Sequence, residues 1–172
     1  MTSEEVTNPQ LNRAIIEAVI SGLPTDATFT RRGATNAYCR IKDAYICVNL
    51  QRDKYKPPKG HRFCVNYGVQ PVPCFHGNFD GLQLDYPAEI GSLFRSRLTP
   101  NFEQDFWWIV QTRRRLAGVV EEIRAAASLH WDGVISKRLT LEQHLAELKG
   151  KMVYFEGQAE TLIRSAIAAR DG

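Results

Sequence analysis

Two runs of alternating apolar and polar residues dominate the first half of the chain, at residues 45–53 and 61–72. Because side chains of a β-strand point alternately to its two sides, this period of two predicts two long strands. One side of each strand is apolar: Ile46, Val48 and Leu50 in the first, and Phe63, Val65, Tyr67 and Val69 in the second. The other sides carry Cys47, Asn49 and Gln51, and Cys64, Asn66, Gly68 and Gln70. This pattern is typical of an antiparallel sheet with one buried and one more polar face.

Apolar residues that recur every three or four positions predict helices near both ends of the chain. The first helix has Asn8 as its N-cap and Pro9 at its first position, and it ends at Gly22. Its apolar stripe consists of Leu11, Ala14, Ile15, Ala18 and Val19. Thr140 and Gln143 form the capping box of a later helix. Two further stripes are Leu116, Val120, Ile123 and Ala127, and Ala159, Leu162, Ile163, Ala166 and Ile167.

Shorter segments complete the expected sheet. Residues 28–32 and 36–41 alternate around a turn and predict two short strands. Residues 71–87 are rich in Gly, Pro, Asn and Asp, which indicates a long loop. Residues 92–99 fit either a fifth strand or a helical turn.

The order of helix, strands and helices predicts an α+β domain, with an antiparallel sheet of about four to six strands and helices packed on one face. We expect a single domain over residues 9–170 and a flexible N-terminus over residues 1–8. The chain of 172 residues is long enough for one core, and its net charge of +3 permits acidic partners without demanding them. With no signal peptide and no apolar run of membrane length, we expect a cytoplasmic protein without membrane contact.

The four cysteines, Cys39, Cys47, Cys64 and Cys74, do not have the spacing of common zinc sites, so we expect no metal site. We also expect no cofactor. If the two long strands pair, Cys47 and Cys64 could face each other. They would then form a disulfide in an oxidising compartment, or remain small reduced side chains in the cytosol.

Several short motifs occur in a characteristic order: Phe29-Thr30-Arg31-Arg32-Gly33, Tyr38-Cys39-Arg40, Val48-Asn49-Leu50-Gln51, Phe63-Cys64-Val65-Asn66-Tyr67-Gly68-Val69, Arg97-Leu98 and Trp107-Trp108. Over residues 11–150 this order resembles the bacterial family known as Domain of Unknown Function 4304. The resemblance implies an N-terminal helix followed by a sheet, and it implies no known activity, cofactor or catalytic residue. Thr99 departs from the family, which has Gly after the Arg-Leu pair.

Three groups of residues are candidates for a binding surface. The amides Asn49, Gln51 and Asn66 would cluster on one face of paired strands, where they could bind a partner or satisfy the backbone of a covering loop. The loop between the long strands contains five basic residues, among them Lys54 and Lys56, with Tyr55 interleaved, so it could contact phosphates or form a solvated hairpin tip. The third group joins Trp107, as a partner anchor, to two arginines of the family motifs, Arg40 and Arg97.

No catalytic signature accompanies these surfaces: the sequence has no G-x-S-x-G, no H-E-x-x-H and no phosphate-binding loop. We therefore expect a non-enzymatic module that binds a macromolecule, in the first place another protein. One alternative is nucleic-acid binding through the basic 52–62 hairpin loop. The other is a small-molecule pocket beside Asn49, Gln51 and Asn66.

Overall fold

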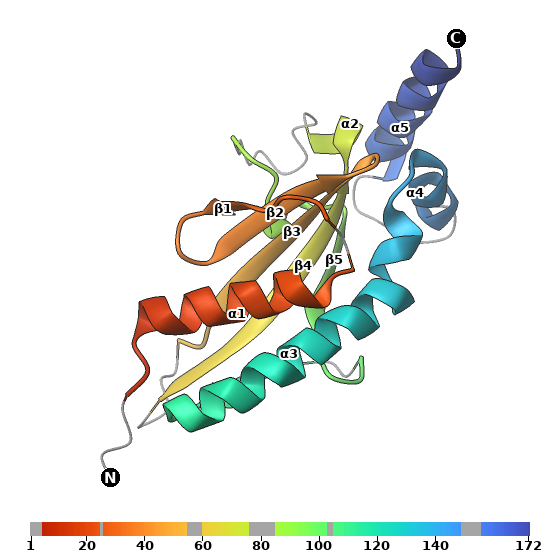
Figure 1. Cartoon of the computed structure of the whole chain (residues 1–172). Helices are drawn as coiled ribbons and strands as arrows, with labels where there is room; N and C mark the ends of the chain where they lie inside the picture. Colours follow the sequence, from red (N-terminus) through yellow and green to blue (C-terminus); the bar gives the residue numbers. More distant parts are fainter. Residues whose placement is uncertain (1–4, 25, 55–59, 76–84, 103–104, 149–155) are drawn as a thin grey trace.

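The computed structural model describes residues 5–24, 26–54, 60–75, 85–102, 105–148 and 156–172, and Figure 1 shows how their elements are arranged. In chain order the elements are α1 (Asn8–Gly22), β1 (Thr30–Arg32), β2 (Asn36–Ile41), β3 (Ala44–Arg52), β4 (His61–Pro71), α2 (Val72–Phe75), the 3-10 helix η1 (Glu89–Gly91), β5 (Phe94–Leu98), β6 (Trp108–Val110), α3 (Arg113–Gly133), the 3-10 helix η2 (Ile135–Arg138), α4 (Leu141–Leu148) and α5 (Glu156–Asp171).

Six antiparallel strands form one sheet with the order β1-β2-β3-β4-β5. The sixth strand, β6, also pairs with β4, beyond the end of β5. Strand β3 pairs along its whole length with residues 63–71 of β4, with Leu50 opposite Val65 and Asn49 opposite Asn66. The predicted alternation is therefore confirmed, and one set of side chains shares each face of the sheet.

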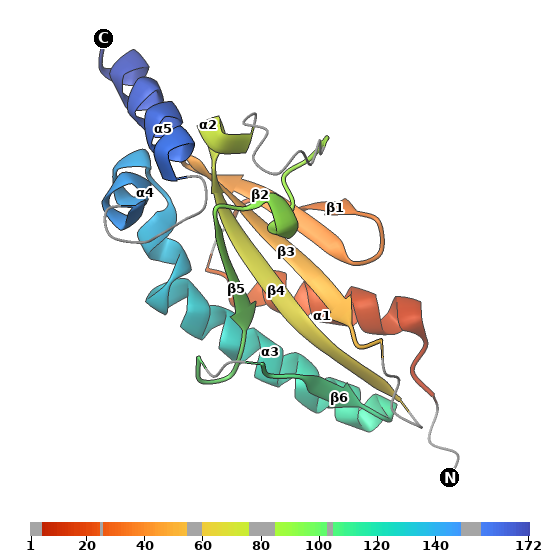
Figure 2. The same ribbon diagram turned by 180° about the vertical axis from the view of Figure 1, so that it is seen from behind.

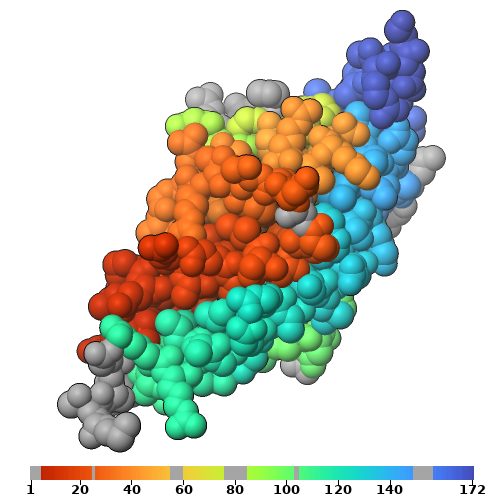
Figure 3. Space-filling view, viewed as in Figure 1, coloured from red at the N-terminus to blue at the C-terminus, as the bar shows by residue number. Residues whose placement is uncertain are grey.

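Helices α1 and α3 lie side by side on one face of the sheet and cover its apolar side (Figures 1 and 3). Residues that are at most 3% exposed fill the space between these layers, among them Ile15, Val19, Ile46, Val65, Tyr67 and Ile123. The two helices approach closely at Gly22, where a Cβ atom would come within 2.5 Å of the carbonyl oxygen of Arg124. The expected α+β fold with helices on one face is confirmed.

A second, smaller core joins α2, α4 and α5 at one end of the molecule (Figure 2). It contains Cys74, Leu141, Leu148, Ala159 and Ile163. The fully buried ring of His144 belongs to the same region and stacks on Phe94 with ring centroids 5.4 Å apart. The predicted capping box of α4 is confirmed: Gln143 N donates to Thr140 Oγ1, and Thr140 N donates to Gln143 Oε1.

Some boundaries differ from those expected from the sequence. Helix α1 is capped by Thr7, not Asn8, because the Thr7 hydroxyl accepts from Gln10 N while the Gln10 side chain accepts from Thr7 N. Strand β1 covers only residues 30–32 of the expected 28–32. Residues 94–98 form a strand, which settles the alternative left open for residues 92–99. Among the described residues, no helix is both long enough and apolar enough to span a membrane.

Candidate functional site

The sheet face opposite α1 and α3, called here the polar face, has a covered half and an open half. In the covered half the segment around η1 lies against β3 and β4, and Cys47, Gly68 and Gln70 are buried beneath it. Gly68 permits this contact, because a Cβ atom there would come within 2.3 Å of Ser92 Oγ. Gln70 holds the covering segment, since its Oε1 accepts a hydrogen bond of 2.6 Å from Leu93 N.

The two cysteines of this face do not face each other across the strands. Cys47 lies opposite Gly68, and Cys64 lies opposite Gln51, so the strand register separates their side chains. All four cysteines are buried and free. Burial raises the pKa of the Cys39, Cys47 and Cys74 thiols to about 12, which keeps them protonated and poorly nucleophilic at neutral pH.

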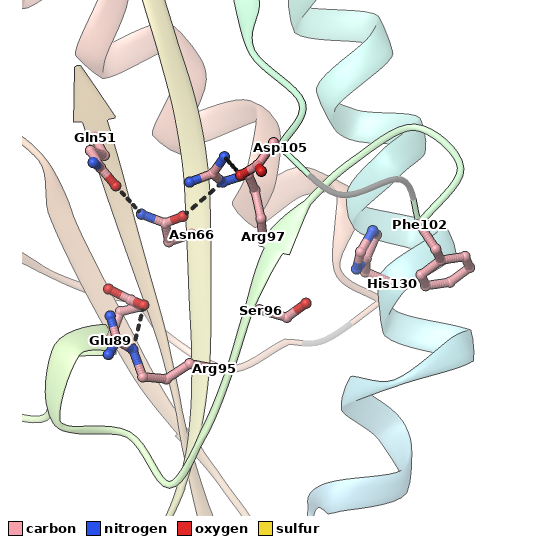
Figure 4. A pocket seen from close by; sticks show the side chains of 9 residues that line it. All are labelled: Gln51, Asn66, Glu89, Arg95, Ser96, Arg97, Phe102, Asp105 and His130. Atoms are coloured by element: carbon pink, nitrogen blue, oxygen red, sulfur yellow. Dashed lines mark hydrogen bonds and ion pairs between the residues drawn. The ribbon is translucent and has the colours of Figure 1, made fainter. Parts of the chain in front are cut away.

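The open half of the polar face carries a network of amides and one guanidinium group (Figure 4). Asn49 Nδ2 donates to Asn36 Oδ1 at 2.8 Å, and Asn66 Nδ2 donates to Gln51 Oε1 at 2.9 Å. Asn66 Oδ1 in turn accepts from Arg97 Nε at 3.4 Å. These amides bind one another and Arg97. The other role that the sequence suggested for them, a hydrogen bond to the backbone of a covering segment, is taken by Gln70.

Trp107 contacts two arginines of neighbouring strands. The guanidinium carbons of Arg62 on β4 and Arg97 on β5 lie 5.2 Å and 5.1 Å from the centroid of its ring, which is a cation–π arrangement. The adjacent Trp108 points to the other side of the strand and is 1% exposed in the core, where it stacks near Phe63.

In three ion pairs of this region the two partners differ in exposure, which determines the charges that face the solvent. Arg62 pairs with Asp53 and Arg95 pairs with Glu89, at 3.0 Å and 2.8 Å. The two carboxylate side chains are only 10% and 8% exposed, while their arginines are 42% and 50% exposed, so positive charge dominates the surface here. The third pair, Arg97 with Asp105 at 2.9 Å, is reversed, because Arg97 is 23% exposed and Asp105 is 89% exposed.

A hollow of about 500 Å³ opens over this region, as Figure 4 shows from close by. The polar face lines it with Gln51, Asn66, Glu89, Arg95, Arg97 and Asp105. At the edge beyond β5 it is bordered by Ser96, Phe102 and His130. His130 is buried, and burial lowers its pKa, so the neutral ring bonds Thr99 N through Nε2 and the Tyr67 hydroxyl through Nδ1. Because both ring nitrogens of His130 are bound within the chain, this edge of the hollow serves packing.

The structure brings four of the predicted site residues together: Gln51, Asn66, Arg97 and Trp107. Asn49 lies on the same face and bonds Asn36, one strand further away. Arg40 is exposed at the far end of β2, where its Nε donates to Lys42 O, and Lys54 is exposed just after β3. Tyr55 and Lys56 lie outside the described residues.

Sequence reasoning missed Arg62, Arg95 and Asp105 as parts of this site. Arg95 and Arg97 stand two positions apart, so their alternation could have placed both on one face once residues 94–98 were taken as a strand. Nothing in the sequence indicates that Asp105 reaches Arg97. Among the described residues no group of three metal-ligating side chains forms, and the chemistry of this face is that of hydrogen-bond donors and positive charge.

Comparisons with curated proteins and with solved structures find no match. A family model does match, over residues 29–131, which include the whole sheet and most of α3. The matched part contains every residue of the polar face described above and excludes α1, α4 and α5. By this match over more than half of its length, the chain belongs to the family described as Domain of unknown function (DUF4304).

Proposed function

We propose that this domain is a non-enzymatic module that binds another protein through the open half of its polar face. The observation that carries the proposal is the cation–π contact of the Trp107 ring with the guanidinium groups of both Arg62 and Arg97, beside the linked amides. Tryptophan and arginine are the residue types most enriched at the energetic centres of protein interfaces. Here both are fixed by neighbours in the free protein, which lowers the entropy lost on binding.

The surface also offers hydrogen-bond donors on a rigid support. Gln51 accepts from Asn66 through its oxygen, which leaves its NH2 group directed away from that bond. Arg95 uses only Nε in its bond to Glu89. Donors carried by strands hold their positions better than donors on loops, so this half of the sheet suits recognition of a folded or extended polypeptide.

Nucleic-acid binding through the 52–62 hairpin is less well supported. One of its five basic residues is engaged by α1, because Arg52 Nη2 donates to Asn12 Oδ1 at 2.7 Å. A nucleic-acid surface would need this cation for phosphates. The two readings differ in salt dependence, because neutralising several phosphates makes affinity fall steeply between about 50 and 200 mM salt.

Site-specific photo-crosslinking tests the proposal. A benzophenone amino acid replaces Ile109, which is 44% exposed beside Arg62 and outside the amide network, and a matched control carries it at Ala125, which is exposed on α3 behind the sheet. We expect a defined protein to crosslink at position 109 in cells of the source organism, to be absent at position 125, and to disappear when Trp107→Ala is added. Crosslinks to nucleic acid alone, or identical patterns at both positions, would refute the proposal.

A further inference from the structure

Arg97 is held in place by side chains that leave part of its guanidinium group free to bind a ligand. Its Nε donates to Asn66 Oδ1, its plane lies near the Trp107 ring, and Asn66 is itself fixed by Gln51. A planar guanidinium group fixed in this way matches the two oxygens of a carboxylate. Arg97 is thus prepared to recognise an acidic group.

A carboxylate already occupies this place. Asp105 Oδ1 accepts from Arg97 Nη1 at 2.9 Å, and its side chain is 89% exposed. An ion pair with one partner so exposed contributes little to stability, so a competing carboxylate can replace it at small cost.

The backbone around Asp105 is also unusual. Asp105 has a φ of 56°, and Phe102, in the same connection between β5 and β6, has a φ of 61°. Both lie in the left-handed region, which Asp adopts more readily than most residues and which is costly for a bulky residue such as Phe102. Strain of this kind clusters at binding sites, where the surrounding structure maintains it for function.

We infer that Asp105 occupies, within the chain, the place that an acidic side chain of the partner protein takes on Arg97. This inference rests on the proposed protein-binding function and names the chemistry of the partner. The surrounding charge favours an acidic chain, because Arg62 and Arg95 face the solvent while their carboxylate partners are buried. Ile109, which is 44% exposed and pairs with Arg62 across β4 and β6, adds an apolar contact. The partner segment therefore combines Asp or Glu with apolar residues.

The first test uses a defined probe, the acetylated and amidated hexapeptide Asp-Leu-Asp-Leu-Asp-Leu, with its Asn-Leu counterpart as the uncharged control. The side-chain Nε–Hε signals of Arg97 and Arg62 are followed by ¹⁵N NMR during titration of the full chain. We expect the acidic peptide to shift the Arg97 signal with saturation and the Asn peptide to leave it in place.

The second test removes the internal competitor. Asp105→Asn is expected to tighten binding of the acidic peptide about 1.5- to fivefold, which is the factor that corresponds to an exposed ion pair of about 0.2–1 kcal/mol. Glu121→Gln is the matched control, since Glu121 is an exposed acid paired with Arg124 on α3, and it should leave the affinity unchanged. A gain in affinity is informative because a misfolded variant would show a loss.

Three outcomes overturn the inference: unchanged or weaker binding by Asp105→Asn, equal tightening by Glu121→Gln, or a single-stranded oligonucleotide that moves the Arg97 signal where the acidic peptide does not. Its failure is distinguishable from failure of the proposed function. A partner that crosslinks at position 109 while Asp105→Asn has no effect leaves protein binding intact and removes only the acidic recognition. Tightening without any crosslinked protein keeps the carboxylate site and removes the protein partner.

Discussion

Replacing His144 by leucine is expected to make the protein more resistant to mild acid. The ring of His144 is fully buried, and neither of its nitrogens has a hydrogen-bond partner among the described residues. Burial, with a smaller contribution from the positive charge of Arg138, lowers the pKa of His144 to about 4. Arg138 is itself engaged by Glu147 through two hydrogen bonds of 2.5 Å and 2.7 Å and remains near the ring.

The sign and size of the effect follow from linkage. The unfolded chain, with an ordinary histidine pKa near 6.5, binds a proton more readily than the folded chain, so the free energy of unfolding falls as the pH drops from 6.5 toward 4. Between pH 7.5 and pH 5.0 this one group removes about 2 kcal/mol from the folded state. His144→Leu abolishes that loss, and at pH 7.5 it stabilises the fold by about 1 kcal/mol by eliminating two unsatisfied nitrogens.

Urea unfolding at pH 7.5 and pH 5.0, followed by tryptophan fluorescence, measures both quantities. The pH dependence of the free energy of unfolding is compared between wild type and variant. The difference isolates the contribution of His144 from that of His130, whose pKa is also lowered by burial. His144→Gln serves as the control: it does not titrate but remains polar, so it should lose the pH dependence without the gain at pH 7.5. If wild type and His144→Leu lose the same free energy of unfolding between the two pH values, the reasoning is wrong.

Three further predictions concern the sheet, a helix terminus and the thiols. Gly68→Ala should lower the free energy of unfolding by about 1–3 kcal/mol, because its Cβ would collide with Ser92, and thermal unfolding should show a clear fall in melting temperature. Gly157→Ala, with open space around it in α5, is the control and should be neutral or stabilising. Thr140→Ala should lower the free energy of unfolding by about 1 kcal/mol, seen as a lower urea midpoint, because Gln143 N loses its capping oxygen. The four buried cysteines should react with a thiol reagent at pH 8 only after denaturant is added, and rapid modification of the native protein would contradict their burial.

The long strands were predictable because each carries a strict period of two over many residues. Ile46, Val48 and Leu50 could share a face only if the whole strand did, and the partner strand repeats the pattern, so the buried face of each strand followed. The register did not follow, because a period of two leaves several pairings open, and Cys47 lies opposite Gly68 instead of Cys64. The helices were predictable in the same way from their apolar stripes. The cap of α1 was misplaced by one residue because Thr7 and Asn8 are both good capping residues, and the choice depends on which one Gln10 reaches.

The site was predictable only in part, because it is assembled from segments without periodicity. The amides Gln51 and Asn66 lie on predicted strands, at positions whose side chains point to the same face of the sheet. Their place on one face could therefore be predicted once the two strands were taken to pair. That Ser92 would cover Gly68, and that Asp105 would reach Arg97, depends on the path of connections whose residues alternate with no fixed period. Tertiary contacts of this kind leave no local signal in the chain.

The way in which β5 and β6 share one side of β4 has a mechanical consequence. Residues 65–69 of β4 pair with β5 and residues 61–63 pair with β6, so this margin of the sheet has a seam at Cys64. Arg97 near the end of β5 and Trp107 just before β6 form a cation–π contact across this seam. A bound chain that contacts both side chains would hold β5 and β6 together at the seam. The backbone amide hydrogens of both strands would then exchange with deuterium more slowly.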